Sequence, residues 1–430
     1  SMLVEARGIH LTIDTNLLNE ELRFERDSFE GSSVENFEPV TNERGFFPIP
    51  FFAISTDFFS DWIAAGIAVY GPHSYGKACL TEVVDGECIV EPENGARHML
   101  VASDLIEIFS MFATAIALNA GEGDLLLGIA GGVAFQQIDI DLVVDQVIPP
   151  LGDPYTENPN FQGTFRARDM TDIRPAFNFG LTYILGNLRL GLSARPGLDW
   201  KSTGRFDIDL PDAVVDLVEF SDDELELDVK QAGSYRFGVG WFGGEHPYYA
   251  DRSKWDLELN VVYEDWSRSE AFVATPNANL VFAGAELPLN PVVQPKGYQD
   301  TFSLRLGGSY AFTNFLTVDA GAFLESAAQT NALTNADFIS WERLSLGGGV
   351  SYDVTDFLRL TASYSHILSP DRTVTNGKVN QSLPLSQCAG PDYTDPTCRA
   401  PGTPNGNAQN NGTWSSSFQV IGIGLAVNFQ

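Results

Sequence analysis

The chain has 430 residues and a net charge of −32, yet only 19% of its side chains are charged. Such an acidic protein repels the phosphates of nucleic acid, which argues against a nucleic-acid partner. The longest apolar run, Leu125–Phe135, covers eleven residues, whereas a membrane-spanning helix needs about 20. If this chain crosses a membrane, it therefore crosses with strands.

The first residues, Ser1-Met2-Leu3, lack the basic start and apolar core of a signal peptide. A strand-like segment, Val4–Ile13, follows directly. We therefore expect a mature or recombinant chain whose first barrel strand lies close to its start.

Tight turns alternate with long polar segments from there to the end of the chain. The turns are predicted at Phe59–Asp61, Gly121–Asp124, Gly186–Leu188, Gly243–Lys254, Thr313–Phe315 and Thr355–Phe357. The long segments are predicted at about 14–44, 74–97, 145–171, 201–233, 270–299, 328–340 and 373–413. Seven long segments and six turns separate fourteen strands.

The second half of the chain alternates apolar and polar residues with a period of two, which is typical of strands. The clearest segments are Phe302–Phe312, Leu316–Glu325, Arg343–Tyr352 and Leu358–Ser365. Arginines fall on the polar face: Arg189, Arg195, Arg236, Arg305, Arg343 and Arg359. Aromatic residues gather near the predicted strand ends, where a barrel carries its interfacial girdles: Trp62, Trp200, Tyr235, Trp255, Tyr310, Tyr352 and Trp414.

A soluble sandwich also alternates, but it has no reason to place all its long loops at one end. A bacterial barrel does, with short periplasmic turns and long extracellular loops. The last strand, Ile421–Phe429, has an apolar face that ends on an aromatic residue. The sequence therefore predicts an all-β protein with one domain over residues 1–430. It is a 14-stranded antiparallel transmembrane β-barrel in the outer membrane of a Gram-negative bacterium.

Four cysteines form two local pairs, Cys79 with Cys88 and Cys388 with Cys398, each in a polar segment. Neither spacing is that of a zinc site, and no Asp-x-Asp-x-Asp-Gly calcium loop is present, so no metal site is predicted. Two disulfides, each closing a small extracellular loop, are the simplest interpretation, and they imply an oxidising compartment. No cofactor is expected.

Four segments then resemble the FadL-type outer-membrane transporters of long-chain fatty acids and other hydrophobic compounds. They are Gly66–Gly76 (GIAVYGPHSYG), Tyr263–Ser267 (YEDWS), Ser303–Gly308 (SLRLGG) and Leu316–Gly321. The order of these motifs, more than any one of them, is similar to that family over nearly the whole chain. The family also carries an N-terminal plug with an Asn-Pro-Ala motif, which is absent from the chain as given. We therefore transfer no gating step to these residues.

The resemblance implies capture of a fatty acid or other hydrophobic molecule by extracellular loops, passage into an apolar lumen pocket, and lateral exit through a break in the third strand. Candidate capture residues in the third and fourth long loops are Val147, Ile148, Leu151, Val214, Val215, Leu217, Val218 and Phe220. The last five are spaced like a short amphipathic helix beginning at Pro211-Asp212. Packing of these residues into a loop cap is an equally good interpretation.

The candidate lateral exit is Gly71-Pro72, where hydrogen bonds of the third strand would be interrupted, although a simple strand end fits as well. The expected partners are the hydrophobic ligand and the surrounding lipid and lipopolysaccharide, with the barrel itself a monomer.

Two other functions fit a barrel of this kind: adhesion through the acidic loops to a surface partner, and general porin activity. An enzyme is not expected. The five histidines are His10, His73, His98, His246 and His366, and only Ser365-His366 forms a suggestive neighbouring pair. Adjacent strand residues point to opposite faces, so this pair cannot act together. No Gly-x-Ser-x-Gly motif is present.

Overall fold

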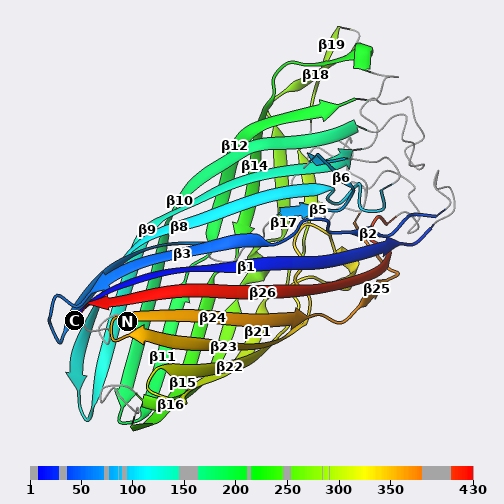
Figure 1. Cartoon of the computed structure of the whole chain (residues 1–430). Helices are drawn as coiled ribbons and strands as arrows, with labels where there is room; N and C mark the ends of the chain where they lie inside the picture. Colours follow the sequence, from blue (N-terminus) through cyan, green and yellow to red (C-terminus); the bar gives the residue numbers. More distant parts are fainter. Residues whose placement is uncertain are drawn as a thin grey trace.

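The computed structural model describes residues 8–28, 36–71, 77–85, 87–89, 94–144, 163–210, 215–245, 253–282, 284–289, 291–379 and 408–429. Within these ranges the chain forms strands and short 3-10 turns, and no helix is long and apolar enough to cross a membrane. The strands close into one antiparallel barrel (Figure 1).

Fourteen staves make the barrel wall, and several are built from two strands in succession. In chain order they are β1 (Ile9–Arg26); β3 (Phe47–Thr56); β4 (Ile63–Tyr70) with β5 (Lys77–Cys79); β8 (Ala102–Ala120); β9 (Gly123–Val144); β10 (Gly163–Leu185); β11 (Leu188–Arg195) with β12 (Leu198–Asp209); β14 (Glu224–Gln231) with β15 (Ser234–Glu245); β16 (Ser253–Glu264) with β17 (Ala271–Pro276); β20 (Val292–Pro295) with β21 (Thr301–Ala311); β22 (Leu316–Glu325); β23 (Arg343–Thr355); β24 (Leu358–Leu368) with β25 (Arg372–Val374); and β26 (Gly412–Phe429).

Smaller elements lie in the extracellular connections. They are β2 (Val40–Thr41), β6 (Val83–Val84), β7 (Glu87–Cys88), β13 (Val218–Phe220), β18 (Asn279–Phe282), β19 (Ala285–Pro288) and the 3-10 turns η3 (Val215–Leu217), η4 (Trp266–Arg268) and η5 (Asn331–Leu333). β13, β18 and β19 form a separate three-stranded sheet at the extracellular tip (Figure 1).

The ring closes through β1, which pairs with β3 on one side and with β26 on the other, from Ile9↔Phe429 to Arg26↔Gly412. Short connections lie together at one end, beside both labelled chain ends (Figure 1). Gly121 and Gly186 begin two of these turns with φ values of 69° and 56°, which glycine adopts without a steric cost. The fourteen predicted strands and the alternation of turns with long loops are confirmed.

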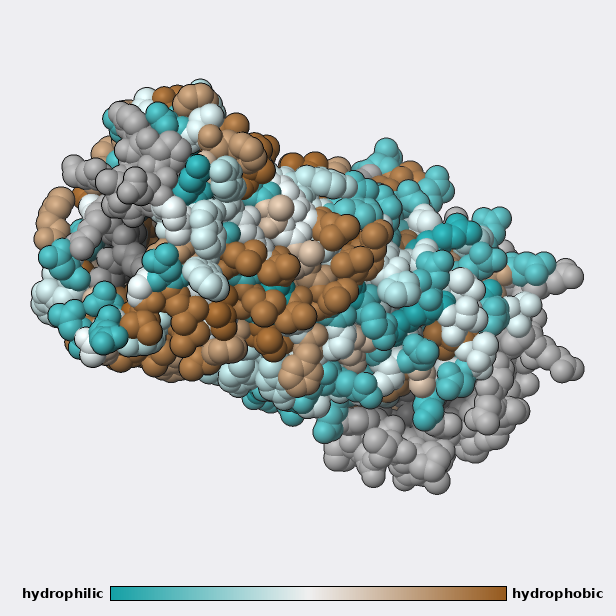
Figure 2. All heavy atoms as spheres, turned by 90° about the horizontal axis from the view of Figure 1, so that it is seen from below, coloured by the Kyte–Doolittle hydropathy of each residue, from teal (hydrophilic) through white to brown (hydrophobic). Residues whose placement is uncertain are grey.

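Side chains alternate between the lipid-facing wall and the lumen as the sequence predicts. In β23, Leu346 is 55% exposed on the outside, whereas Ser345 is 3% exposed on the inside. Figure 2 shows apolar side chains gathered across the middle of the wall, with hydrophilic residues beyond them. Two predicted girdle residues are an exception: Trp200 and Trp414 are buried inside the barrel, so their assignment to the girdle is wrong.

Several strands are longer than predicted. β1 continues to Arg26, β12 continues to Asp209, and β14, β17 and β20 occupy positions that the sequence assigned to loops. These segments extend beyond the apolar band, so their outward residues are charged and mimic loop composition. Arg166 on β10, for example, forms outward ion pairs with Asp207 and Asp209 on β12, at 3.2 and 3.3 Å.

Two staves bend where their lipid-facing part ends. The seventh stave bends at Pro196-Gly197, between β11 and β12, and the eighth bends at Ala232-Gly233, between β14 and β15. In the seventh stave, even-numbered residues face the lipid before the bend and the lumen after it. Leu192 is 53% exposed on the outer wall, whereas Trp200 is 1% exposed in the lumen. The eighth stave shows the same reversal: Phe237 on β15 faces out, whereas Leu227 on β14 faces the lumen.

Candidate functional site: an apolar path through the lumen

An apolar cavity of about 50 Å³ lies in the extracellular half of the lumen. Inward residues of β9, β10, β14, β17 and β20 line it, because each strand there carries apolar residues on its inner face. Phe165, Leu225 and Leu227 are each 5% exposed or less. These residues belong to a larger buried cluster that also contains Phe206, Ile208 and Leu280. The arrangement suits an uncharged apolar molecule.

The structure places the predicted capture residues of the fourth loop in two groups. Val218 is buried in the cluster around the cavity, and Phe220 packs against that cluster with its ring edge-on to Phe206 at 5.8 Å. Val215 and Leu217 instead are 47% and 49% exposed. The predicted amphipathic helix is wrong for the described residues, because Val215–Leu217 makes one 3-10 turn and β13 follows.

The third-loop candidates Val147, Ile148 and Leu151, together with Val214, lie outside the described residues. The structure therefore brings Val218 and Phe220 to the cluster that surrounds the cavity, without placing them in its lining. The lining consists of other residues, which the sequence analysis did not single out.

A buried ion pair forms part of the cavity wall, because Asp337 is one of the lining residues. Lys296 is fully buried, and its Nζ contacts Asp337, whose side chain is 8% exposed. The same Nζ lies 4.5 Å from the centre of the Phe272 ring and 3.4 Å from Gln294 Oε1. Burial lowers the pKa of the Lys296 ammonium, and the Asp337 carboxylate opposes that shift. Nothing in the sequence distinguishes Lys296 from other loop lysines, so its role could not be predicted.

Below the cavity, a second cluster joins the third to the seventh staves (β4, β8, β9, β10 and β12) across the inner wall. Phe109, Met111, Ala134, Ala176 and Trp200 are buried together, and Tyr70 packs against them. Tyr70 stacks on Phe109 at 5.5 Å and accepts a hydrogen bond from Asn178 Nδ2 at 3.3 Å. Trp200 Nε1 donates to Gln231 Oε1 at 3.3 Å, and Gln231 Nε2 donates to Glu107 Oε2 at 3.2 Å.

The register between the third stave (β4 with β5) and β8 changes beside this cluster. Among the described residues, β4 pairs with β8 up to Tyr70↔Phe109 and β5 pairs with it from Lys77↔Asp104, so seven positions along the third stave correspond to five along β8. Gly71 follows Tyr70 at this point, and a Cβ there would lie 3.1 Å from the Ile49 side chain. Pro72 lies outside the described residues.

The lower lumen is wider and polar. A pocket of about 460 Å³ is lined by small residues of β9 and β10, such as Gly128 and Gly180, and by Arg189, Arg236 and Arg305. Three of the six arginines predicted on the polar face therefore share one pocket, with Glu258 as an acidic neighbour. Sequence periodicity placed these residues on the inner face, but it could not show that neighbouring strands bring them together.

On the extracellular side, Cys79 and Cys88 form a disulfide with a Cα–Cα distance of 6.0 Å, as predicted. Cys388 and Cys398 lie outside the described residues. Among the described residues, no group of three or more His, Cys, Asp and Glu side chains could hold a metal ion.

Residues 124–394, more than half of the chain, match the family described as outer membrane protein transport protein (OMPP1/FadL/TodX). A comparison with curated proteins finds no match. The chain is similar in structure to a Pseudomonas aeruginosa FadL homologue, with 14% identity and a TM-score of 0.75 over 100% of this chain and 92% of that chain.

It is also similar to the P. putida toluene transporter TodX, with 12% identity and a TM-score of 0.63 over 100% of this chain and 92% of that one. The CymD monoaromatic hydrocarbon channel gives 15% identity and a TM-score of 0.59 over 99% and 89%. At such identities the likeness establishes the fold alone.

Proposed function

Because the chain belongs to the OMPP1/FadL/TodX family, whose members are Gram-negative outer-membrane barrels that transport hydrophobic compounds, we propose that it takes up hydrophobic molecules by loop capture, passage through an apolar cavity and lateral exit. The observation that carries the proposal is the enclosed apolar cavity above the polar lumen. A wet polar pore would not attract an apolar molecule, whereas a site lined by Phe165, Leu225 and Leu227 does.

The first step is capture by the extracellular loops. We assign it to the predicted residues Val147, Ile148 and Leu151 of the third loop, and to Val214, Val215 and Leu217 of the fourth. Exposed apolar side chains at Val215 and Leu217 support this assignment, since an apolar molecule arriving from water binds first to exposed apolar surface. Val218 and Phe220 then connect this surface to the cavity cluster.

The last step is lateral exit at Gly71-Pro72. The mismatch of seven residues against five between strand three and β8 supports this proposal, because strands that lose their register also lose the hydrogen bonds that seal a barrel wall. Tyr70 and Phe109 would lie at the inner edge of such an exit.

The cavity favours a compact, uncharged substrate. Typical ligand pockets measure about 300–1,000 Å³, so a cavity of about 50 Å³ must open as the ligand enters, and a small molecule requires the least displacement. One observation favours a long-chain fatty acid as a second candidate. Lys296 lies next to the cavity and could bind a carboxylate, although Asp337 already occupies that position.

Filling the cavity tests the proposal. Leu225→Trp should lower uptake of labelled toluene about tenfold in cells that lack other such transporters, because the indole occupies the cavity. Leu346→Trp, on the lipid-facing wall, is the matched control and should transport normally. Normal toluene uptake by a folded Leu225→Trp barrel would contradict the cavity route.

The two substrate classes are separated by Asp337→Asn, which frees Lys296. Oleate binding should tighten in this variant if the substrate is a fatty acid, whereas toluene uptake should stay within about twofold in either case. We also propose that the barrel acts as a monomer surrounded by lipopolysaccharide. The closed ring supports this to the extent that, among the described strands, β1 pairs on both sides and no second copy is needed to complete the wall.

A further inference from the structure

A second irregularity of the wall lies between the sixth stave (β10) and the seventh (β11 with β12), away from the third stave (β4 with β5). β10 pairs with β11 from Leu185↔Leu188 to Phe179↔Ala194, and with β12 from Thr171↔Thr203 to Thr164↔Asp209. Between these ladders, Asp172–Asn178 and Arg195–Ser202 share no strand pairing, although residues 163–210 are all described. We call these two facing segments the β10 seam.

Sequence features on both sides of the seam prevent an ordinary ladder. Pro175 has no backbone N–H to donate, and Pro196-Gly197 bends strand seven away. Gly197 is needed there, because a Cβ would collide with the Arg268 side chain and with the Gln231 carbonyl oxygen. A side chain replaces one missing backbone bond: Lys201 N donates to Asp172 Oδ2 at 2.7 Å. The seam is therefore encoded in the sequence.

On the lumen side, Trp200 covers the seam. Its side chain is 1% exposed and packs with Ala176 of β10 and Ala134 of β9, the small residues that leave room for the indole. Its hydrogen bond to Gln231 is a single contact of 3.3 Å. Ser202 Oγ also donates to Gln136 Oε1 of β9, at 3.0 Å. The closure therefore consists of side chains, with the Trp200 indole as the largest, instead of a continuous hydrogen-bonded sheet. A rotation of the Trp200 side chain would connect the seam to the Phe109 cluster beside the third strand.

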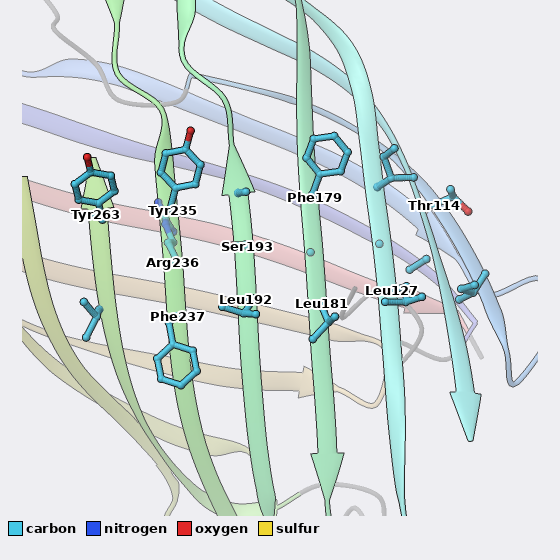
Figure 3. Close-up of a pocket in the computed structure, with 17 residues that line it drawn as sticks. Thr114, Leu127, Phe179, Leu181, Leu192, Ser193, Tyr235, Arg236, Phe237 and Tyr263 are labelled. Carbon is cyan, nitrogen blue, oxygen red and sulfur yellow. The ribbon is translucent and has the colours of Figure 1, made fainter. Parts of the chain in front are cut away.

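On the outer side, an apolar hollow of about 750 Å³ begins where the seam ends. Phe179 and Ala194, the last paired residues below the seam, both line it, together with Leu192, Phe237 and Val261. Tyr235 and Tyr263 lie at one rim, with their hydroxyl groups pointing the same way, while Arg236 lies on the opposite face of its strand (Figure 3). The hollow therefore faces the lipid.

The two tyrosines indicate the depth of this hollow. Tyr263 is the penultimate residue of β16 before the extracellular turn η4, and its hydroxyl donates to Asp300 Oδ2 at 2.7 Å. Tyrosines of this kind mark the boundary between the apolar and polar parts of the membrane. The hollow thus lies in the outer leaflet, directly below that boundary, where apolar compounds accumulate.

We propose that the β10 seam is a second lateral opening, through which uncharged apolar molecules dissolved in the outer leaflet enter the lumen from the outer hollow past Trp200. This inference rests on the proposed uptake of apolar compounds, and it adds an entry route that bypasses the extracellular loops. A compound that has already partitioned into the outer leaflet would not need to return to water before it is captured.

The opening is tested with a probe that cannot enter from above. The protein is reconstituted in vesicles that contain a phospholipid with a diazirine on one acyl chain close to the glycerol, at the depth of the seam, then illuminated, and its peptides are mapped. A lipid tail stays in the bilayer, so it labels Trp200 or Ala176 only through the wall. Leu192 is the positive control, and the equally buried Trp341 and Phe24 of the extracellular lumen are the negative controls.

Closing the seam provides the second measurement. Ala176→Cys with Leu198→Cys is bridged by a short bis-thiol reagent, because both residues pack in the Trp200 cluster. The control pair, Ala322→Cys with Leu346→Cys, joins β22 and β23, which are already paired and lie away from the seam and the hollow. Bridging the seam should lower labelling of Trp200 at least fivefold and slow entry of vesicle-dissolved toluene, whereas bridging the control pair should change neither.

The outcomes separate this inference from the proposed function. Labelling of Trp200 that the seam bridge abolishes supports the opening, even if toluene is not transported and the proposed function fails. Labelling of Trp200 no greater than that of Trp341, in a barrel that still takes up toluene, overturns the opening and leaves the proposed function intact.

Discussion

The two sides of this barrel are built differently. From β21 to β23 the register is unbroken: every residue of β22 from Thr317 to Glu325 pairs with both neighbours, and each strand keeps one face to the lipid throughout. From β10 to β17 the strands bend, ladders stop and restart, and inner and outer faces exchange at Pro196-Gly197 and Ala232-Gly233.

The cavity, the Lys296–Asp337 pair, Trp200 and the outer hollow all lie on the bent side or against it. A regular ladder satisfies every backbone group and leaves no reason for side chains to reorganise. An interrupted ladder needs side chains to complete the wall, and side chains can move. The regular side is therefore the more rigid frame, and the bent side carries the path that we propose for the ligand.

The largest effect is expected where the bent side buries charge. Lys296→Met leaves the Asp337 carboxylate buried without its partner, which should lower the free energy of unfolding by about 3–5 kcal/mol. Urea titration in lipid vesicles, followed by tryptophan fluorescence, measures it. The double variant Lys296→Met/Asp337→Leu should recover most of the loss, and a single variant as stable as the wild type would show that the pair is dispensable.

The second largest effect on stability is expected when a charge is placed on the lipid-facing wall, and it should differ between the two sides. Leu346→Arg, on the regular side, should cost about 2–4 kcal/mol, because its guanidinium faces the apolar bilayer. Lys201→Leu removes an outward charge from β12 on the bent side and should change stability by less than about 0.5 kcal/mol, since that strand segment lies beyond the apolar band. Equal effects in the same urea titration would mean that both strands are equally deep in the membrane.

The bend itself is tested by two glycines of the same stave. Gly197→Ala forces Arg268 and the Gln231 carbonyl group to shift and should cost about 1–3 kcal/mol. Gly191→Ala has no neighbour within 4 Å and should be neutral or slightly stabilising. Thermal loss of the folded band in cold SDS gels provides the measurement. The interpretation of the bend fails if the two variants have the same midpoint.

The last effect concerns pH at the extracellular end. His98 is buried; its Nδ1 lies 3.1 Å from the Val143 carbonyl oxygen, and Arg97 Nε donates to its Nε2. Burial, reinforced by Arg97 and Arg26, lowers the pKa of His98 well below 6.5. The unfolded chain therefore binds the proton first, and stability falls as the pH drops below about 6.5, by at most about 1.4 kcal/mol per pH unit.

Replacing the ring removes this dependence. His98→Gln should flatten the slope of unfolding free energy between pH 7 and pH 5, measured by urea titration at each pH. The regular side serves as the internal control, because Leu346→Ala should leave the slope as it is in the wild type. An unchanged slope in His98→Gln would assign the acid sensitivity to another group.

The regular side was predictable from the sequence, and the bent side only in part. In Phe302–Phe312 and Arg343–Tyr352 the period of two continues for the whole strand, so both the strands and their inner faces are confirmed. In 201–209 the same period is present, but Arg205, Asp207 and Asp209 face out, and their charges led to the prediction of a loop. Charge was interpreted as solvent exposure, whereas it marks a strand that extends beyond the bilayer.

The site was less accessible to this reasoning. Trp200 was predicted to lie in the aromatic girdle because it is an aromatic residue near a predicted strand end. The alternation of apolar and polar residues restarts after Pro196-Gly197, and it does not reveal that the chain bends there and turns Trp200 towards the lumen. Lys296 and Asp337 are 41 positions apart in predicted loops, and only the closed ring brings them together. Val218 and Phe220 were identified by their apolar character, whereas the cavity residues Leu225 and Leu227 were within a segment assigned to a loop.

The pairing of β1 with β26 has a consequence for how the protein is made. Eighteen residue pairs join the first strand to the last, and Ile9 and Phe429 are 420 positions apart. Until the last strand arrives, the growing sheet carries two unpaired edges, which are the sites at which sheets aggregate. The exported chain therefore depends on an escort in the periplasm until its last strand is paired, and loss of β26 would leave a sheet that cannot close.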